Sequence, residues 1–131
     1  MIAKQIEVEN VVRFIGPVDE DDKVALYQQA RAFLYPSIYE GFGLPALEAL
    51  ACGVPVVGSN ASSIPEIVGD AGMLVDPHNA RAMAGALIAV CTEDSLHDEL
   101  SERALVQAAK FSWDKCAQET VAAYEDVVRG A

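Results

Sequence analysis

The stretch from residue 35 to residue 57 constrains the fold more than any other part of the sequence. It predicts the end of a strand, a loop with two glycines, a short helix and a second strand. Pro36 ends the first strand, because proline has no N–H to give to a sheet ladder. Pro45 favours the first position of the helix, and Gly53 is placed to end it. A helix N-terminus that follows a glycine loop at the carboxyl end of a strand is a typical anion-binding arrangement.

Two carboxylates flank this loop. Glu40 lies in the loop and Glu48 lies about one turn inside the helix, so both can border the same cleft. Neither should hold a phosphate, because like charges repel, but a carboxylate accepts hydrogen bonds from sugar hydroxyls. The local chemistry therefore predicts amide donors for a phosphate and flanking acceptors for a sugar and a ribose. A purely structural turn, with Glu40 solvated and Glu48 exposed on the helix, explains the same residues.

Length and composition limit the class of protein. A chain of 131 residues is one domain with a real core, and 52% hydrophobic residues exclude disorder. No apolar run approaches the roughly 20 residues that span a bilayer, and we expect no signal peptide and no transmembrane segment. A net charge of −11 makes nucleic acid and anionic membranes poor partners for the surface as a whole. The positive potential that a diphosphate needs must therefore be local or come from outside this sequence.

The cysteines and histidines do not predict a metal site. Three cysteines at wide spacing favour a reducing compartment over a disulfide framework. We expect buried thiols at Cys52, Cys91 and Cys116, since no Cys-x-x-Cys pair accompanies them. His78 and His97 are isolated, and we expect both at the surface.

Strands alternate with helices along the chain. The expected strands cover residues 11–15, 32–35, 54–58 and 72–75, and the expected helices cover 23–31, 46–51, 80–91, 96–110 and 113–128. This alternation predicts an α/β fold, a three-layer, Rossmann-like, doubly wound parallel sheet of about four strands with C-terminal helices. Ligands of such sheets bind at the carboxyl ends of the strands, where the loop of Glu40 is placed.

Several segments carry local expectations. Ser63 and Glu66 fit a capping box at the start of a helix, and Asn79 or Asp76 can cap the next one. Ligand binding and turn chemistry explain a group of three polar residues equally well: Ser59, Asn60 and Ser62. The apolar side of the helix at 96–110 is expected to consist of Leu96, Leu100, Leu105 and Ala109. Ser112 is expected to cap the last helix, whose apolar side is Trp113, Cys116, Thr120, Val121, Tyr124 and Val128.

The block EGFGLPALE, continued by ALACGVPVVGSN, resembles the signature of the family 4 (group 1) retaining glycosyltransferases. In this block seven residues separate Glu40 from Glu48. The resemblance continues through residues 62–77 and 111–113 and reaches back to 12–18, so it covers nearly the whole chain. These enzymes have the two-domain GT-B fold and bind a nucleotide-sugar donor mainly through the C-terminal domain. The resemblance implies that residues 1–131 form a single domain, a partial nucleotide-sugar-binding C-terminal domain.

The resemblance also implies roles for the loop. Glu40 would be the catalytic residue beside the transferred sugar, and Glu48 would bind the nucleotide ribose. Contacts to the donor sugar and phosphate would come from Glu40, Gly41, Phe42, Gly43 and Leu44. The implied reaction retains the configuration of the sugar and needs no cofactor and no metal, the nucleotide-sugar being a substrate. Paired aspartates bind a metal in the other large glycosyltransferase class, but the N-cap and first turn of a helix explain the acidic run at 19–22 better.

Part of the family pattern is missing from these residues. Its C-terminal domain opens with two further strands, the first followed by a Gly-Arg and Lys-Gly segment whose cations hold the diphosphate. Lys4, Arg13, Lys23 and Arg31 lie in other contexts. The acceptor-binding domain is absent too, so we expect this polypeptide alone to bind a nucleotide-sugar weakly and to transfer nothing. The alternative is a non-catalytic binding or assembly module with a truncated GT-B-like fold.

The missing strands have a structural consequence. In the family's order, 3-2-1-4-5-6, they lie between the strands expected at 11–15 and 32–35, and their loss would expose strand edges. Either the first strand shifts to pair with its new neighbour, or two chains associate as a homodimer. We expect a cytoplasmic protein, and leave open a membrane-peripheral location for the full-length enzyme.

Overall fold

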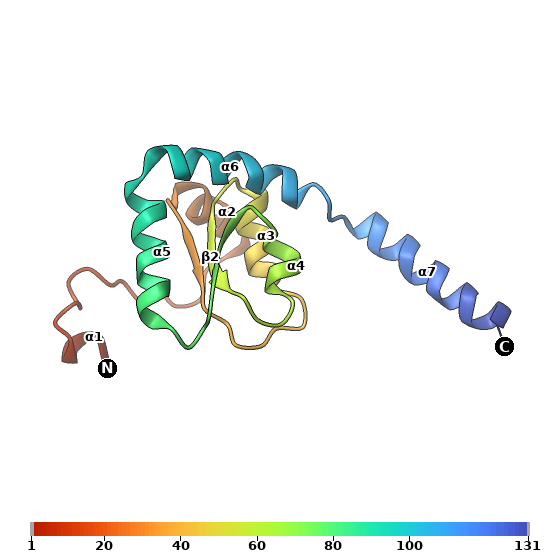
Figure 1. The fold of residues 1–131 in the computed structure, drawn as a ribbon, viewed down its shortest axis with the longest axis horizontal. Coiled ribbons are helices and arrows are strands. Elements are labelled where there is room, and N and C mark those ends of the chain that lie inside the picture. The colour runs from red at the N-terminus through yellow and green to blue at the C-terminus, as the bar shows by residue number, and fades with distance from the viewer. Residues whose placement is uncertain (1, 131) are drawn as a thin grey trace.

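The computed structural model describes residues 2–130, with side chains from residue 4 onward. Ten helices and strands follow one another in the described chain (Figure 1). In order they are α1 (Ile2–Gln5), α2 (Glu20–Gln29), β1 (Phe33–Tyr35), α3 (Leu44–Ala51), β2 (Val56–Ser59), α4 (Ile64–Val68), β3 (Gly72–Val75), α5 (Ala80–Thr92), α6 (Asp94–Ala108) and α7 (Trp113–Gly130). The predicted alternation of strands and helices is confirmed.

The three strands form one parallel sheet in the order β1-β2-β3. Phe33 is opposite Val56, and Val56 is in turn opposite Gly72. β2 is central and all four of its residues are buried, as expected for the middle strand of a parallel sheet. Gly72 is required by this pairing, because a Cβ there would lie 2.2 Å from the carbonyl oxygen of Val56.

Helices cover both faces of the sheet, which gives the predicted three layers (Figure 1). On one face α3 and α4 enclose a core cluster that includes Leu50, Val56 and Ile64. On the other face α5 packs against Val57 through Met83, Ala86 and Val90. Successive strand residues point to opposite faces, so the adjacent Val56 and Val57 belong to different clusters.

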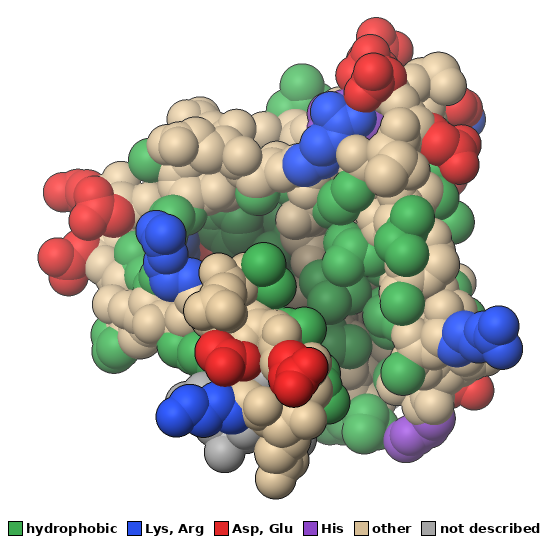
Figure 2. All heavy atoms as spheres, turned by 90° about the vertical axis from the view of Figure 1, so that its left-hand side faces the viewer, with side chains coloured by type: hydrophobic (Ala, Val, Ile, Leu, Met, Phe, Trp, Pro, Cys, Tyr) green, Lys and Arg blue, Asp and Glu red, His purple; other side chains and the backbone are tan. Residues whose placement is uncertain are grey.

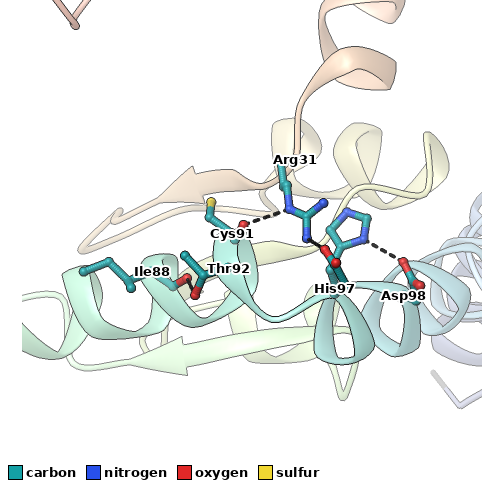
Figure 3. Close-up of polar contacts among 7 residues, drawn as sticks. Arg31, Ile88, Cys91, Thr92, His97 and Asp98 are labelled. Carbon is teal, nitrogen blue, oxygen red and sulfur yellow. Dashed lines mark hydrogen bonds and ion pairs between the residues drawn. The ribbon is translucent and has the colours of Figure 1, made fainter.

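Helix α6 contributes buried residues to both core clusters. Leu100 belongs to the cluster beneath α5, whereas Ala104 belongs to the cluster beneath α3 and α4. Arg31 contacts the end of α5 and the start of α6 (Figure 3). Its Nε donates to the carbonyl of Cys91 at 3.0 Å, and its guanidinium pairs with Asp94. The segment that leads into β1 is thereby tied to the junction between α5 and α6.

The strand predicted at 11–15 does not form, and this prediction is wrong. The amides of Val11 and Val12 instead donate to the carbonyl of Val8 at 3.0 and 3.1 Å, which makes a turn. Val11 and Phe14 are 82% and 68% exposed. A strand needs a partner for its N–H and C=O groups, and no strand within residues 2–130 pairs with this segment. Within residues 2–130 the segment does not pair with β1; association of two chains stays a prediction.

Several side-chain predictions also need correction. The buried residues of α6 are Leu100, Ala104 and Gln107, while Leu105 is 55% exposed. A step of five residues turns about 140° around a helix, so Leu105 cannot share the face of Leu100. Cys91 and Cys116 are exposed rather than buried, and Cys52 is half-buried.

Helix α7 extends away from the rest of the molecule (Figure 1). Its predicted cap is confirmed, since the amide of Lys115 donates to Ser112 Oγ at 3.1 Å. The apolar residues predicted for one side of α7 lie on this helix, but α7 has no buried residue. Trp113 and Tyr124, for example, are 78% and 70% exposed. Sequence periodicity therefore identified an amphipathic helix without identifying what it contacts.

The surface carries apolar as well as charged side chains. Figure 2 views the molecule from the left-hand side of Figure 1 and shows apolar side chains exposed around a hollow, with acidic and basic side chains at its rim. Among residues 2–130, no helix has the length and apolar character needed to cross a membrane.

Candidate functional site

The loop between β1 and α3 has a backbone that only glycine adopts readily. Gly43 is the N-cap of α3 with φ of 103° and ψ of 43°. A Cβ at this position would lie 2.9 Å from Ile64 Cδ1, in the core. Gly43 therefore provides both the turn and the close contact of α3 with α4. Pro45 falls on the second helical position, one residue later than predicted.

Four consecutive backbone amides, from the loop before α3 to the first residue of this helix, have no protein partner within residues 2–130. No hydrogen bond within residues 2–130 is donated by the amides of Gly41, Phe42, Gly43 or Leu44. The first amides of a helix have no intrahelical acceptor, and the helix dipole adds a partial positive charge. Gly41 and Phe42 precede the buried N-cap Gly43, and Leu44 is the first helical residue. The amides of the exposed Gly41, Phe42 and Leu44 are therefore left as donors from which an anion or a hydroxyl oxygen can accept a hydrogen bond.

Glu40 is held as a carboxylate beside these amides. Its Oε1 accepts hydrogen bonds from Tyr35 Oη at 2.7 Å and from Ser37 Oγ at 2.9 Å. These two hydrogen bonds, that from Tyr35 first, lower the pKa of Glu40 below its ordinary value. Burial and the bond to Glu40 raise the pKa of Tyr35 to about 12. At neutral pH Tyr35 is thus a donor and Glu40 an acceptor.

Two serines at the start of α4 secure the loop. Ser62 Oγ accepts from the amide of Glu40 at 3.2 Å and donates to its carbonyl at 2.7 Å. Ser63 Oγ donates to the carbonyl of Phe42 at 2.7 Å and lies 3.1 Å from that of Glu40. The capping box predicted for Ser63 and Glu66 is therefore wrong: Ser63 is the N-cap residue, but its hydroxyl faces the loop and makes no cap hydrogen bond.

Glu48 is bound to helix α2. Its Oε1 accepts from Lys23 Nζ at 3.0 Å, and its Oε2 accepts from Tyr27 Oη at 3.1 Å. Lys23 also pairs with Glu20 at 2.8 Å, and hydrogen bonds to Glu20 and then to Glu48 raise the pKa of Lys23. Burial and then the bond to Glu48 raise the pKa of Tyr27 to about 12. Glu48 is thus paired with α2 while its side chain is 38% exposed, so the purely structural turn with Glu48 exposed on the helix is not contradicted.

Sequence reasoning missed these partners. The sequence around Lys23 does not predict a place for it at the site, yet Lys23 is the cation that pairs with Glu48. Its spacing of four residues from Tyr27 puts both on one face of a helix, which was the available signal. Tyr35 is the last residue of β1 and Ser37 lies in the loop that follows, so both are at the carboxyl end of this strand. Nothing local indicated which carboxylate each pair would contact.

The remaining candidates do not form a site with the glutamates. Glu20, Asp21 and Asp22 form the first turn of α2, as the helix interpretation of the acidic run predicts. In residues 2–130 no group of three His, Cys, Asp or Glu side chains is placed to hold a metal ion. A cavity of about 570 Å³ lies between the loop and the α6–α7 junction. Phe42 and Leu44 line it, but neither Glu40 nor Glu48 does.

Comparisons with known proteins show the family of this chain. The model of the family described as "Glycosyl transferases group 1" matches residues 1–107. The chain is 47% identical over 117 residues to "O-antigen chain mannosyltransferase B" of Escherichia coli. The matched region covers 89% of this chain and 31% of that protein. It is 35% identical over 130 residues to "D-inositol 3-phosphate glycosyltransferase" of Corynebacterium kroppenstedtii, which covers 98% of this chain and 29% of the relative. The chain thus spans about a third of the length of these relatives.

Solved structures show the same fold. Sucrose-phosphate synthase from Thermosynechococcus elongatus superimposes with a TM-score of 0.87 and 27% identity, covering 99% of this chain and 33% of that one. The C-terminal domain of a glycosyl transferase group 1 family protein from Francisella tularensis gives a TM-score of 0.74 at 28% identity, covering 83% of this chain and 57% of that one. The fold is accordingly the truncated Rossmann-like α/β fold of GT-B glycosyltransferases. Since the family model matches more than half of the sequence, this chain belongs to the glycosyl transferases group 1 family.

Proposed function

We propose that this chain is the donor-binding part of a retaining glycosyltransferase, which moves a hexosyl group from a nucleoside diphosphate sugar to an acceptor without a metal ion. One observation supports this most directly. The unpartnered amides of residues 41–44 lie next to Glu40, a carboxylate whose pKa is lowered by Tyr35 and Ser37. Donors for a phosphate and an acceptor for sugar hydroxyls are then adjacent in one loop.

Each part of the loop has a role in the proposed reaction. The amides of residues 41–44, in the loop and at the start of α3, hold the distal phosphate and stabilise the negative charge that develops on it as the sugar leaves. Glu40 accepts from the sugar hydroxyls and stabilises the positive charge that grows on the sugar ring. Glu48 accepts from the ribose hydroxyls and so fixes the nucleotide relative to the phosphate.

We further propose that residues 1–131 act as one domain that is incomplete on its own. The sequence carries a net charge of −11, and the ammonium of Lys23 is already paired with Glu20 and Glu48. Lys110 and Lys115 line the cavity beside Phe42 and Leu44, but Lys110 donates to Gln107 and Lys115 lies 3.9 Å from Glu119. We therefore expect weak compensation of the phosphate charge, so that this polypeptide alone binds a donor weakly and transfers nothing.

Saturation-transfer NMR with a panel of nucleotide-sugars tests the proposal. The panel holds glucose and mannose conjugates of UDP, GDP and ADP, because neither the base nor the sugar follows from the loop. We expect weak saturation transfer from one donor, its loss in Glu40→Gln and Glu48→Gln, and no change in Glu102→Gln. Glu102 is the matched control, as an exposed glutamate of α6.

The other outcomes are equally informative. Micromolar binding by isothermal titration would contradict the incomplete phosphate subsite. Saturation transfer that survives both Glu40→Gln and Glu48→Gln would remove the glutamates from the site. No saturation transfer from any member of the panel would reject donor binding by this chain and favour the non-catalytic assembly module.

A further inference from the structure

Three aromatic side chains connect the two glutamates. The ring of Phe33 lies between those of Tyr27 and Tyr35, with ring centroids 5.4 and 5.6 Å apart. The first pair meets edge to face at 72°, and the second is stacked at 23°. At one end of the row Tyr27 Oη donates to Glu48, and at the other end Tyr35 Oη donates to Glu40.

We propose that Tyr27, Phe33 and Tyr35 are positioning residues that set the separation and direction of the Glu40 and Glu48 carboxylates relative to each other. The inference rests on the proposed function, in which those carboxylates bind the sugar and the ribose of one donor. A ligand that bridges two carboxylates gains from both only if their spacing is already correct. A row of rings in contact supplies such a spacing, because it shortens or bends far less readily than single flexible side chains.

The way the row is built supports this role. Phe33 and Tyr35 are two residues apart on β1 and therefore project from the same face of the strand. Both are half-buried against the core cluster beneath α3 and α4, which restrains them. Tyr27 comes from α2, a helix with no buried residue, and its contacts to Phe33 and Glu48 join that helix to the site.

The hydrogen bonds leave the carboxylates able to bind a ligand. Glu40 uses only Oε1 for Tyr35 and Ser37, so Oε2 accepts no hydrogen bond within residues 2–130. Glu48 uses both oxygens, but each carboxylate oxygen has a second lone pair. Both tyrosines have raised pKa values of about 12, so they remain donors across the neutral range. A row that served only to stabilise the core would not need to end in hydroxyls on two half-exposed carboxylates.

A carboxyl titration by NMR tests the row without any donor. The pKa of Glu40 is measured in the 131-residue protein and in variants, with Tyr124→Phe and Phe14→Leu as matched controls at exposed positions. Tyr35→Phe removes the hydroxyl and should raise the pKa of Glu40. Phe33→Leu removes the stacking partner and should raise it as well, because Tyr35 is then free to leave Glu40. If Phe33→Leu fails to fold by circular dichroism, Phe33→Met takes its place. An unchanged pKa of Glu40 in the folded Phe33 variant would overturn the proposal.

Binding then separates the two ends of the row. The probes are the nucleoside diphosphate alone and the same diphosphate carrying its hexose, taken from the panel above. Tyr27→Phe should weaken both by a similar factor of about 3 to 10, the loss of one hydrogen bond to a charged group at a half-exposed site. Tyr35→Phe should weaken only the sugar conjugate. If the two variants had equal effects on both probes, the assignment of Tyr27 to the ribose end and of Tyr35 to the sugar end would be wrong. If the unaltered protein binds no donor, the proposed function fails, and the Glu40 titration alone decides whether the row positions the carboxylates.

Discussion

Replacing Gly43 with alanine should destabilise the protein strongly, and the structure gives the size of the effect. The backbone of Gly43 has φ of 103°, a conformation that costs a residue with a Cβ roughly 1–3 kcal/mol. The new Cβ would also lie 2.9 Å from Ile64 Cδ1. Ile64 is completely buried, so relief of this contact must displace core packing, at a cost of about 1–3 kcal/mol. Together these give a loss of about 2–6 kcal/mol in the free energy of unfolding, measured by urea titration.

Two further variants separate the backbone strain at Gly43 from the clash of the new Cβ with Ile64. Gly41→Ala is the matched control, since Gly41 lacks a positive φ and has nothing within 4 Å of the position of its Cβ; it should cost less than about 1 kcal/mol. Ile64→Val removes Cδ1 and alone should cost about 0.5–1.5 kcal/mol. In the Gly43→Ala background it should cost less or even stabilise, because it also relieves the clash. Equal stabilities of Gly43→Ala and Gly41→Ala, or strict additivity with Ile64→Val, would refute the reasoning.

Gly72→Ala should prevent folding, because its Cβ would lie 2.2 Å from the carbonyl oxygen of Val56; a cooperative thermal transition near that of the unaltered protein would contradict this. Gln107→Leu should lower the free energy of unfolding by about 1–3 kcal/mol, since its buried amide donates to two carbonyls of α4 at 3.0 and 3.2 Å, and urea titration measures the loss. The low pKa of Glu40 means that its bond to Tyr35 contributes stability above the ordinary carboxyl pKa of 4.5, and that this contribution is lost as pH falls through the folded pKa. Tyr35→Phe should therefore destabilise more at neutral pH than in acid, and a pH-independent difference in urea titrations would contradict it. β1 is an edge strand of the sheet within residues 2–130, which leads us to expect a homodimer; a monomeric mass by light scattering at high concentration would contradict this.

The sequence was sufficient where local chemistry decides the outcome. Alternation of apolar strands with helices predicted the parallel sheet, and the strand at 72–75 has the bounds expected for it. The cap of α5 was predicted as well, since Asn79 accepts from the amide of Ala82. At the loop, glycine permits the positive φ that the turn needs and proline favours the start of a helix, so the turn into α3 followed from residue types alone.

Prediction failed where a partner distant in the sequence decides the outcome. Residues 11–15 have the composition of a strand, but composition cannot supply the neighbour that a ladder requires. Ser63 has the spacing of a capping box, yet the loop of Glu40 competes successfully for its hydroxyl. Lys23 and Tyr27 contact a residue more than 20 positions away, so their role depended on how α2 lies against α3.

Because α6 contributes to both core clusters, it determines when the protein becomes stable during synthesis. Leu100 and Ala104 close the two core clusters, and Gln107 binds the last carbonyls of α4, the helix whose serines hold the loop of Glu40. All three residues follow the loop by more than 50 positions. A ribosome-bound chain that ends before α6 has made every residue of the loop, yet neither core is sealed. The donor loop should therefore acquire its shape late, in one cooperative step with the arrival of α6, and a nascent chain halted before residue 100 should leave it open to proteases.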